Sequence, residues 1–281
     1  MSQRLNSISF AAAILIALSC SLSPISSKAA TLTFGIVPQE SSSKLAQQWT
    51  PMMRYLSDYL GKPVRFATAP DIPTFEQRVA SGQYDIAYMN PYHYAEFAKQ
   101  PGYRVIVRER GKKITGIVVV QQSSNIESLL DLNDQTIAFP APAAFAATIL
   151  VRAELERLGI VYQPKFVSSH ESVYLNVERG FAAAGGGIVR TLDSAEKQGL
   201  RGLRILWKSH GFTPHAFAVH PDLSQEDMAS FQNALLSIAD TTDGLAILET
   251  LNLRPMTTAR DSDWNDVRAL GLNFLEPRGT P

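Results

Sequence analysis

The chain has 281 residues, which suits one or two domains, and its apolar fraction of 45% and charged fraction of 19% are those of a globular protein. Its 26 basic and 26 acidic residues balance, and no run of Lys or Arg exceeds two residues. Because a nucleic-acid-binding surface needs clustered cations to neutralise phosphates, this charge pattern argues against nucleic acid as a partner.

The first residues of the chain have the pattern of a secretory signal. Arg4 precedes an unbroken apolar run over residues 10–18, and small and polar residues follow up to Ala29 and Ala30. The run is too short to cross a bilayer, so we predict a signal peptide over residues 1–29 and a mature protein in the periplasm. Cys20, the single cysteine, allows the alternative of lipoprotein processing with a lipid anchor at that residue.

Strands and helices are predicted in near-regular alternation along the mature chain. Strands are expected at 31–37, 63–68, 84–88, 104–108, 114–120, 135–139, 165–168, 182–189, 203–207 and 216–219. Helices are expected at 45–60, 74–80, within 125–132, up to Gly159, and at 170–179, 225–239, 243–251 and 262–269. Pro51 lies inside the first helix, so a kink or a second helix start is expected there.

This alternation is typical of βαβ units with mostly parallel strands, and hence of an α/β protein. The sequence has no flexible linker, so we predict two lobes joined by strands that cross near residues 112–115 and 210–214. Lobe 1 is then expected to comprise residues 30–113 and 214–281, and lobe 2 residues 114–213.

Polar and aromatic side chains gather after the strand at 84–88, where Tyr88, Asn90 and Tyr92 follow one another closely. In an open α/β sheet, ligands bind beyond the carboxyl ends of the strands, so we expect this tip to contact a ligand. The alternative is that the rings belong to the core and that their polar atoms are bonded locally. Gln39 and Ser42 follow the first strand and are predicted to contribute from the same edge.

The sequence contains none of the motifs that would indicate an enzyme. It lacks a Gly-x-Gly-x-x-Gly turn after the first strand, a Gly-Lys-Ser/Thr phosphate loop and a Gly-x-Ser-x-Gly elbow. The five histidines are scattered without metal-ligand spacing. We therefore predict no catalytic activity, no cofactor and no metal, and a secreted enzyme is the least favoured hypothesis.

Six short segments occur in an informative order along the chain. They read FGIVPQES at 34–41, QWTPM at 48–52, YLG at 59–61, DIAY at 85–88, SHES at 169–172 and LWKS at 206–209. Together they resemble the phosphonate-binding family of periplasmic receptors that supply ABC transporters, over roughly residues 31–250. The resemblance implies a two-lobed α/β fold of the type II periplasmic-binding-protein kind, with mixed sheets and a ligand cleft between the lobes.

The resemblance also implies how the anion is held. In the family, a helix start in lobe 2 binds it through backbone N–H groups and Ser/Thr hydroxyls, where the helix dipole favours negative charge. Here that turn contains Ala143, Ala144 and Phe145, and Thr148 is its one hydroxyl. His170 opens a helix at the equivalent of a ligand-contacting histidine in the family, with a solvent-side position as the alternative.

Two further residues lie close to the presumed cleft. His215 precedes an apolar strand near the second crossing and is counted as a candidate ligand contact. Arg190 could pair with an oxyanion, but it opens a predicted surface helix, so we expect it to be a surface residue.

Two functions use this arrangement. The first hypothesis is a monomeric receptor that delivers a small anion, a phosphonate or related oxyanion, to an ABC permease. The second is the same fold as the periplasmic input of a membrane sensor kinase. Both read out lobe closure, so the sequence leaves the choice between them open, as it does the identity of the ligand.

Overall fold

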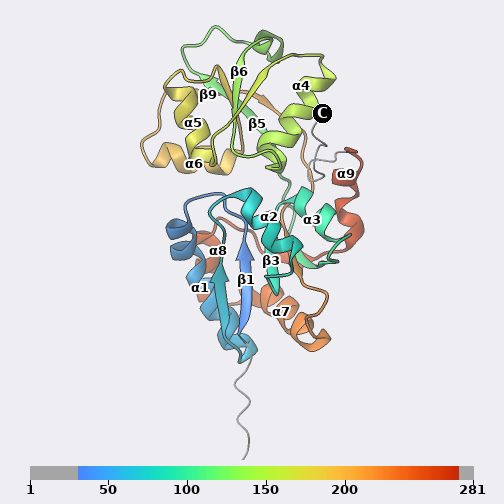
Figure 1. Ribbon diagram of the computed structural model, residues 1–281. Coiled ribbons are helices and arrows are strands. Elements are labelled where there is room, and N and C mark those ends of the chain that lie inside the picture. The colour runs from blue at the N-terminus through green and yellow to red at the C-terminus, as the bar shows by residue number, and fades with distance from the viewer. Residues whose placement is uncertain (1–30, 272–281) are drawn as a thin grey trace, which may run out of the picture.

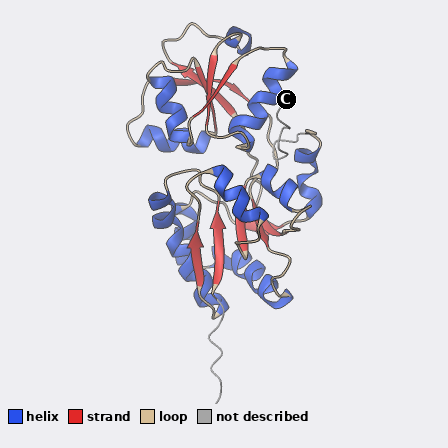
Figure 2. Ribbon diagram, in the orientation of Figure 1, coloured by secondary structure: helices blue, strands red, loops and turns tan. Residues whose placement is uncertain are grey.

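The structure is a computed structural model that describes residues 31–271. Its first sheet contains β1 (Leu32–Ile36), β2 (Val64–Ala67), β3 (Ile86–Met89), β4 (Arg104–Glu109), β10 (Ala216–Val219) and β11 (Met256–Thr258), in the order β11-β4-β10-β3-β1-β2. Its second sheet contains β5 (Ile117–Gln121), β6 (Thr136–Phe139), β7 (Gln163–Phe166), β8 (Ala184–Gly187) and β9 (Leu203–Lys208), in the order β7-β6-β8-β5-β9. We call the two halves built on these sheets lobe 1 and lobe 2 (Figures 1 and 2).

Helices cover both sheets (Figure 1). Lobe 1 carries α1 (Ser42–Leu60), α2 (Ile72–Ala80), α3 (Pro91–Phe97), α7 (Gln225–Ser237), α8 (Thr242–Thr250) and α9 (Asn265–Arg268). Lobe 2 carries a π-helical turn, η2 (Phe145–Ile149), and the helices α4 (Leu150–Arg157), α5 (His170–Glu178) and α6 (Val189–Lys197). Short 3-10 turns complete the structure, namely η1 (Leu129–Leu132), η3 (Ile238–Asp240) and η4 (Asp261–Trp264).

The first helix shows why these segments fold as they do. The apolar residues of α1 recur at helical spacing and bury one face, through Leu45, Trp49, Met52, Met53 and Leu56. Trp49 meets the ring of Phe34 from β1 at a centroid distance of 6.0 Å, so the helix packs directly on the sheet. The helix runs unbroken through Pro51, so the predicted second helix start is wrong.

Both sheets are mixed, as expected for the predicted two-lobed fold. In lobe 1, β1 pairs in parallel with β2 and β3, whereas β10 runs antiparallel to β3 and β4. In lobe 2, β6 is parallel to β7 and β8, whereas β5 is antiparallel to β8 and β9. The carboxyl ends of the parallel strands in each lobe therefore face the other lobe (Figure 1).

Two elements were missing from the prediction. Helix α3 begins directly after β3, because Asn90 caps it and Pro91 occupies its first turn, a common helix start. Strand β11 pairs with the edge of β4. It has only three residues, which is too few to give a periodic signal in the sequence.

The chain crosses between the lobes twice, and the two crossings pair with each other. Ile114 and Phe212 form an isolated antiparallel bridge, in which each backbone N–H donates to the other residue's carbonyl at 2.9 Å. The predicted crossing points, 112–115 and 210–214, contain this bridge. The hinge between the lobes is therefore a short two-stranded ribbon.

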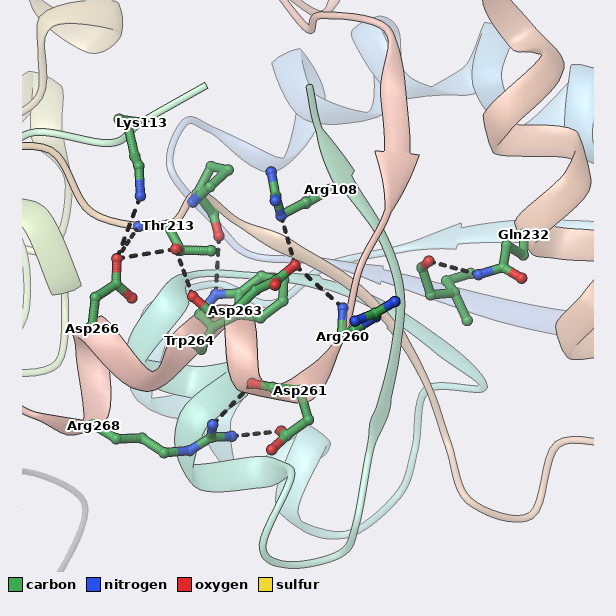
Figure 3. A network of polar contacts seen from close by, with 12 residues as sticks. Arg108, Lys113, Thr213, Gln232, Arg260, Asp261, Asp263, Trp264, Asp266 and Arg268 are labelled. Carbon is green, nitrogen blue, oxygen red and sulfur yellow. Dashed lines mark hydrogen bonds and ion pairs between the residues drawn. The ribbon is translucent and has the colours of Figure 1, made fainter. Parts of the chain in front are cut away.

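The C-terminal segment of the described chain ties both crossings to lobe 1 (Figure 3). The Asp266 carboxylate accepts hydrogen bonds from the Thr213 backbone N–H at 2.8 Å and from its hydroxyl at 3.0 Å, and it lies 3.6 Å from the Lys113 ammonium. The buried Trp264 indole donates to the Pro214 carbonyl at 3.1 Å. We call Trp264 and Asp266 the hinge clamp.

Replacing the clamp carboxylate should weaken the fold. Asp266→Ala is expected to lower the free energy of unfolding by about 2 kcal/mol, because Thr213 loses hydrogen bonds to a charged acceptor. Urea unfolding measures the difference. Asp222→Ala, whose side chain is 90% exposed, is the control and should leave the midpoint unchanged. Equal midpoints for the two variants would show that the clamp does not stabilise the protein.

Candidate functional site

A small cavity of about 20 Å³ lies between the lobes, where the strand ends of both sheets meet. It is large enough for about one water molecule. Lobe 1 contributes residues that follow β1 and β3, and lobe 2 contributes η2 and the starts of α5 and α6. The lining residues are Val37, Gln39, Ile72, Asn90, Ile114, Ala144, Phe145, Ala146, Ala147, His170, Ile188 and His215.

The backbone of η2 supplies hydrogen-bond donors at this cavity. The N–H groups of Thr148 and Ile149 both donate to the Ala144 carbonyl, at 2.8 and 3.2 Å, and begin the helical pattern. The N–H groups of residues 145–147 precede it, so they are the orphan donors of a helix start. Such donors and the helix dipole favour an anion.

Two glycines let this turn lie directly on the lobe 2 sheet. A Cβ atom on Gly186 of β8 would sit 1.8 Å from the Ala147 carbonyl oxygen, and one on Gly116 would sit 2.1 Å from that of Ala146. Neither distance is possible for a real side chain. Gly116 and Gly186 therefore let the η2 turn lie against the lobe 2 sheet.

Asn90 connects the two lobes at the cavity. Its carbonyl oxygen accepts the His93 backbone N–H at 2.8 Å and so caps α3, while its amide nitrogen donates to the Ala143 carbonyl at 3.2 Å. These two bonds fix which end of the side chain is the donor. The Asn90 amide group is thus held by the α3 cap at one end and aimed at the lobe 2 turn at the other.

Gln39 joins His215 to Arg190 across the cleft. Its amide nitrogen donates to His215 Nε2 at 3.0 Å, so that ring nitrogen is an acceptor and carries no proton. The Gln39 carbonyl oxygen accepts a hydrogen bond from the Arg190 guanidinium of α6. Tyr88 stacks on the His215 ring with a centroid distance of 4.9 Å and an interplanar angle of 20°.

Both cavity histidines are neutral. Burial, and next the positive charge of Arg190, lower the pKa of His170 to about 3. Burial likewise holds the pKa of His215 well below its ordinary value, with Arg190 as the next cause. His170 is fixed by the start of α5, where Ser169 caps the helix by accepting the Ser172 N–H at 3.0 Å. The solvent-side alternative for His170 is therefore wrong.

Further contacts close the cleft on the side of α1. Lys44 Nζ donates to the Ser194 hydroxyl of α6 at 3.1 Å and lies 3.3 Å from the Glu40 carboxylate. Ile72 of α2 packs with Ala141, Ala144 and Ala147 in a small apolar cluster. The alanines in and before η2 thus form an apolar contact with Ile72 of lobe 1.

The structure brings together most of the candidate residues. Gln39, Asn90, Ala144, Phe145, His170 and His215 line the cavity, Tyr88 lines the adjoining pocket, and the Ala143 carbonyl accepts the bond from Asn90. Three candidates lie elsewhere. Ser42 is exposed at the start of α1, Tyr92 is buried within α3, and the Thr148 hydroxyl donates to the Ala141 carbonyl at 2.7 Å.

Arg190 is not the surface residue that its position in the sequence predicts. The expected surface residue is half-buried in the cleft and bonded to Gln39, which is 151 positions away in the chain. The position of Arg190 in the sequence could have indicated a place in the cleft, because Arg190 comes shortly after β8 just as Asn90 comes after β3. A residue just beyond the end of a buried strand is placed at the ligand edge of the sheet.

Within residues 31–271, no group of three or more His, Cys, Asp or Glu side chains could hold a metal ion. No helix in that range is both long and apolar enough to cross a membrane.

Residues 34–264 match the family model of the periplasmic substrate-binding protein of phosphonate ABC transporters. The chain is 25% identical to the phosphate-import protein PhnD of Mycolicibacterium smegmatis, over 70% of this chain and 68% of that protein. It is 23% identical to the phosphonates-binding periplasmic protein of Escherichia coli, over 88% and 78% of the two chains.

Among the solved structures that are similar in fold is that of PhnD1 from Prochlorococcus marinus in complex with methylphosphonate. It superimposes with a TM-score of 0.79 at 15% identity, covering 86% of this chain and 97% of the other. The two-lobed architecture, the helix start at the cleft and the match over residues 34–264 agree, and the chain belongs to the family of periplasmic substrate-binding proteins of phosphonate ABC transporters.

Proposed function

We propose that the protein captures a phosphonate or related oxyanion in the cavity between its lobes and delivers it to an ABC permease. The observation that carries the proposal is the set of donors around that cavity. The N–H groups of residues 145–147 come from lobe 2, and the Asn90 amide comes from lobe 1, where its nitrogen now contacts the Ala143 carbonyl and His93 Nε2, each at 3.2 Å; both sets line the small cavity, and a ligand between the lobes would take the place of the Ala143 carbonyl. An oxyanion bound there would draw hydrogen bonds from both lobes at once and so favour the closed arrangement.

The neutral histidines fit this function. A neutral imidazole can donate one hydrogen bond and accept another, so His215 keeps its bond from Gln39 while its other nitrogen carries the proton. The nearby positive charge comes from Arg190, which is always protonated. The ligand charge is thus met by dipoles and one guanidinium, with no carboxylate lining the small cavity.

The size of the cavity requires the lobes to move. A volume of about 20 Å³ accommodates about one water molecule, and a phosphonate group is several times larger. Binding therefore includes separation of the lobes at the paired crossings. We keep residues 30–113 and 214–281 for lobe 1 and residues 114–213 for lobe 2 as the proposed boundaries.

The remaining expectations stay predictions. The signal over residues 1–29 and the alternative lipid anchor at Cys20 lie outside the described residues. A monomeric state and a role as sensor-kinase input are compatible with the same site.

Calorimetric titration with methylphosphonate, phosphate, phosphite, sulfate and arsenate tests the function. At least one anion is expected to bind, and at 100 times its dissociation constant it should stabilise the protein by about 2.7 kcal/mol. Asn90→Ser keeps a helix cap but removes the amide donor, so binding should weaken about 10- to 100-fold. Asn90→Asp keeps the cap and places a carboxylate beside the anion, which should abolish binding.

Asn176→Ser is the matched control, because Asn176 donates within α5 to the Ser172 carbonyl at 2.8 Å and does not line the cavity. Its affinity should equal that of the unchanged protein. Failure of every anion to bind, or normal binding by Asn90→Asp, would refute the proposed function.

A further inference from the structure

A second, larger pocket adjoins the small cavity on the side of the crossings. We call it the hinge-side pocket. It has a volume of about 220 Å³ and shares Ile114, Ile188 and His215 with the small cavity. The charged side chains that line it include Glu109, Lys112, Arg190, Asp193 and Lys208. A ligand whose anionic head occupies the small cavity can therefore extend a substituent into a charged space.

Arg190 is the most informative residue of this pocket. Its guanidinium is half-buried and bonds to the neutral amide oxygen of Gln39, and it forms no ion pair with any carboxylate of residues 31–271. A partly buried charge without a counter-charge is unfavourable. The guanidinium has five N–H donors, so a fork suited to a carboxylate remains beside the bond to Gln39.

Two more cations face the same pocket. Lys112 is half-buried and Lys208 is exposed, and within the described range neither forms an ion pair. The fourth lining cation, Lys113, is already paired with Asp266 of the hinge clamp at 3.6 Å. Arg190 is thus supported by two lysines whose charges are also uncompensated.

The acidic side chains of the pocket are fewer and differently placed. Glu109 is 4% exposed, and one of its carboxylate oxygens accepts the Arg254 backbone N–H at 3.0 Å. Asp193 is exposed on α6. Three unpaired cations therefore outweigh two carboxylates, one of which is partly satisfied by the backbone. The pocket suits a substituent that is negatively charged.

We propose that the ligand is an alkylphosphonate with a second acidic group, a carboxylate on a short carbon chain. The phosphonate head would bind the helix start at the small cavity, and the carboxylate would bind Arg190 in the hinge-side pocket. This inference rests on the proposed function, because it requires an oxyanion head in the small cavity. It makes Arg190 the residue that selects among phosphonates.

Isothermal titration with matched ligands tests the inference. The ligands are 3-phosphonopropionate, ethylphosphonate, which lacks the tail charge, and 2-aminoethylphosphonate, which reverses it. We expect 3-phosphonopropionate to bind at least about 10-fold more tightly than ethylphosphonate, as one charge-assisted bidentate pair allows. In Arg190→Gln this ratio should fall to about 1, and Arg190→Lys should restore part of it, because lysine keeps the charge without the fork.

Two controls make the result specific. Arg179→Gln removes an exposed arginine at the end of α5 and should leave the ratio unchanged. Lys208→Gln removes an exposed pocket cation and should lower the ratio less than Arg190→Gln does. The urea midpoint of each variant reports whether it is folded.

The outcomes separate the two levels of the proposal. Binding of all three phosphonates with equal affinity would overturn the inference and leave the proposed function standing. Tightest binding of 2-aminoethylphosphonate would also overturn it, and would assign the tail to Glu109 and Asp193. Binding of none of these ligands, nor of any anion in the first panel, would overturn the proposed function itself.

Discussion

Acidification from about pH 7.5 to about pH 5.0 should lower the free energy of unfolding by about 2 kcal/mol through His170, and should lower it further through His215. Both are buried and neutral in the folded protein, because burial and the Arg190 charge hold the pKa of His170 at about 3 and that of His215 well below its ordinary value. In the unfolded chain both take up protons below about pH 6.5. The unfolded state then binds more protons, so stability rises with pH across this window and falls as the pH is lowered.

His170 contributes about 2 kcal/mol of the expected loss at about pH 5.0, since its folded pKa of about 3 lies below that value, and His215 adds a loss of the same sign. The positive charge of Lys112 acts on the pKa of His215 in the same direction. Urea unfolding at the two pH values measures the slope. His170→Gln should remove about 2 kcal/mol of the loss between the two pH values, and His215→Gln should also make the slope smaller.

His210→Gln is the matched control, because His210 is exposed and this variant retains both cavity histidines, His170 and His215. It should keep the full slope. An unchanged slope in both cavity variants would mean that these histidines are not held neutral in the folded protein.

A methyl group added to β8 by Gly186→Ala should have a large effect on both stability and anion binding. Gly186→Ala is expected to destabilise the protein by about 3 kcal/mol and to abolish anion binding. The new Cβ would lie 1.8 Å from the Ala147 carbonyl oxygen and 2.9 Å from the Phe139 ring, so the turn must move away from the sheet. Since that turn presents the free N–H groups to the cavity, stability and binding should be lost together.

Urea unfolding and calorimetric titration check both parts. Gly159→Ala is the control, because Gly159 has a positive φ of 69° but no atom within 4 Å of an added Cβ. Backbone strain alone should cost about 1–2 kcal/mol there, with affinity unchanged. If Gly186→Ala binds the anion normally, the close approach of sheet and turn is not what positions the donors.

Much of the fold could be predicted from the sequence, because local patterns determine it. The apolar periodicity of α1, the buried run of β5 and the Ser169 cap of α5 are each visible within a few residues. The same holds for Asn90 and His170, which stand at the end of a strand and the start of a helix. The six short segments that resemble the phosphonate-binding family, taken in their order along the chain, then predicted the two-lobed architecture.

The rest depends on contacts between distant parts of the chain. The Gln39–Arg190 bond spans 151 positions, and no spacing rule connects these residues. The sequence predicted that the Thr148 hydroxyl would be available to a ligand. In the structure this hydroxyl donates instead to the Ala141 carbonyl of the preceding loop. The role of Gly186 became visible only when the Ala147 carbonyl was placed against it.

The hinge clamp has a consequence for how the cleft opens. Asp266 holds one residue from each crossing, Lys113 and Thr213, so both strands are anchored to lobe 1 as far as the Ile114–Phe212 bridge. We therefore expect lobe 2 to rotate beyond that bridge, on the part of the ribbon where the Ser209 N–H donates to the Gly116 carbonyl at 2.9 Å. Because an added Cβ on Gly116 would lie 2.1 Å from the Ala146 carbonyl oxygen, η2 packs directly on the chain just past the bridge, and we expect the cavity-facing turn to move together with that segment when the cleft opens.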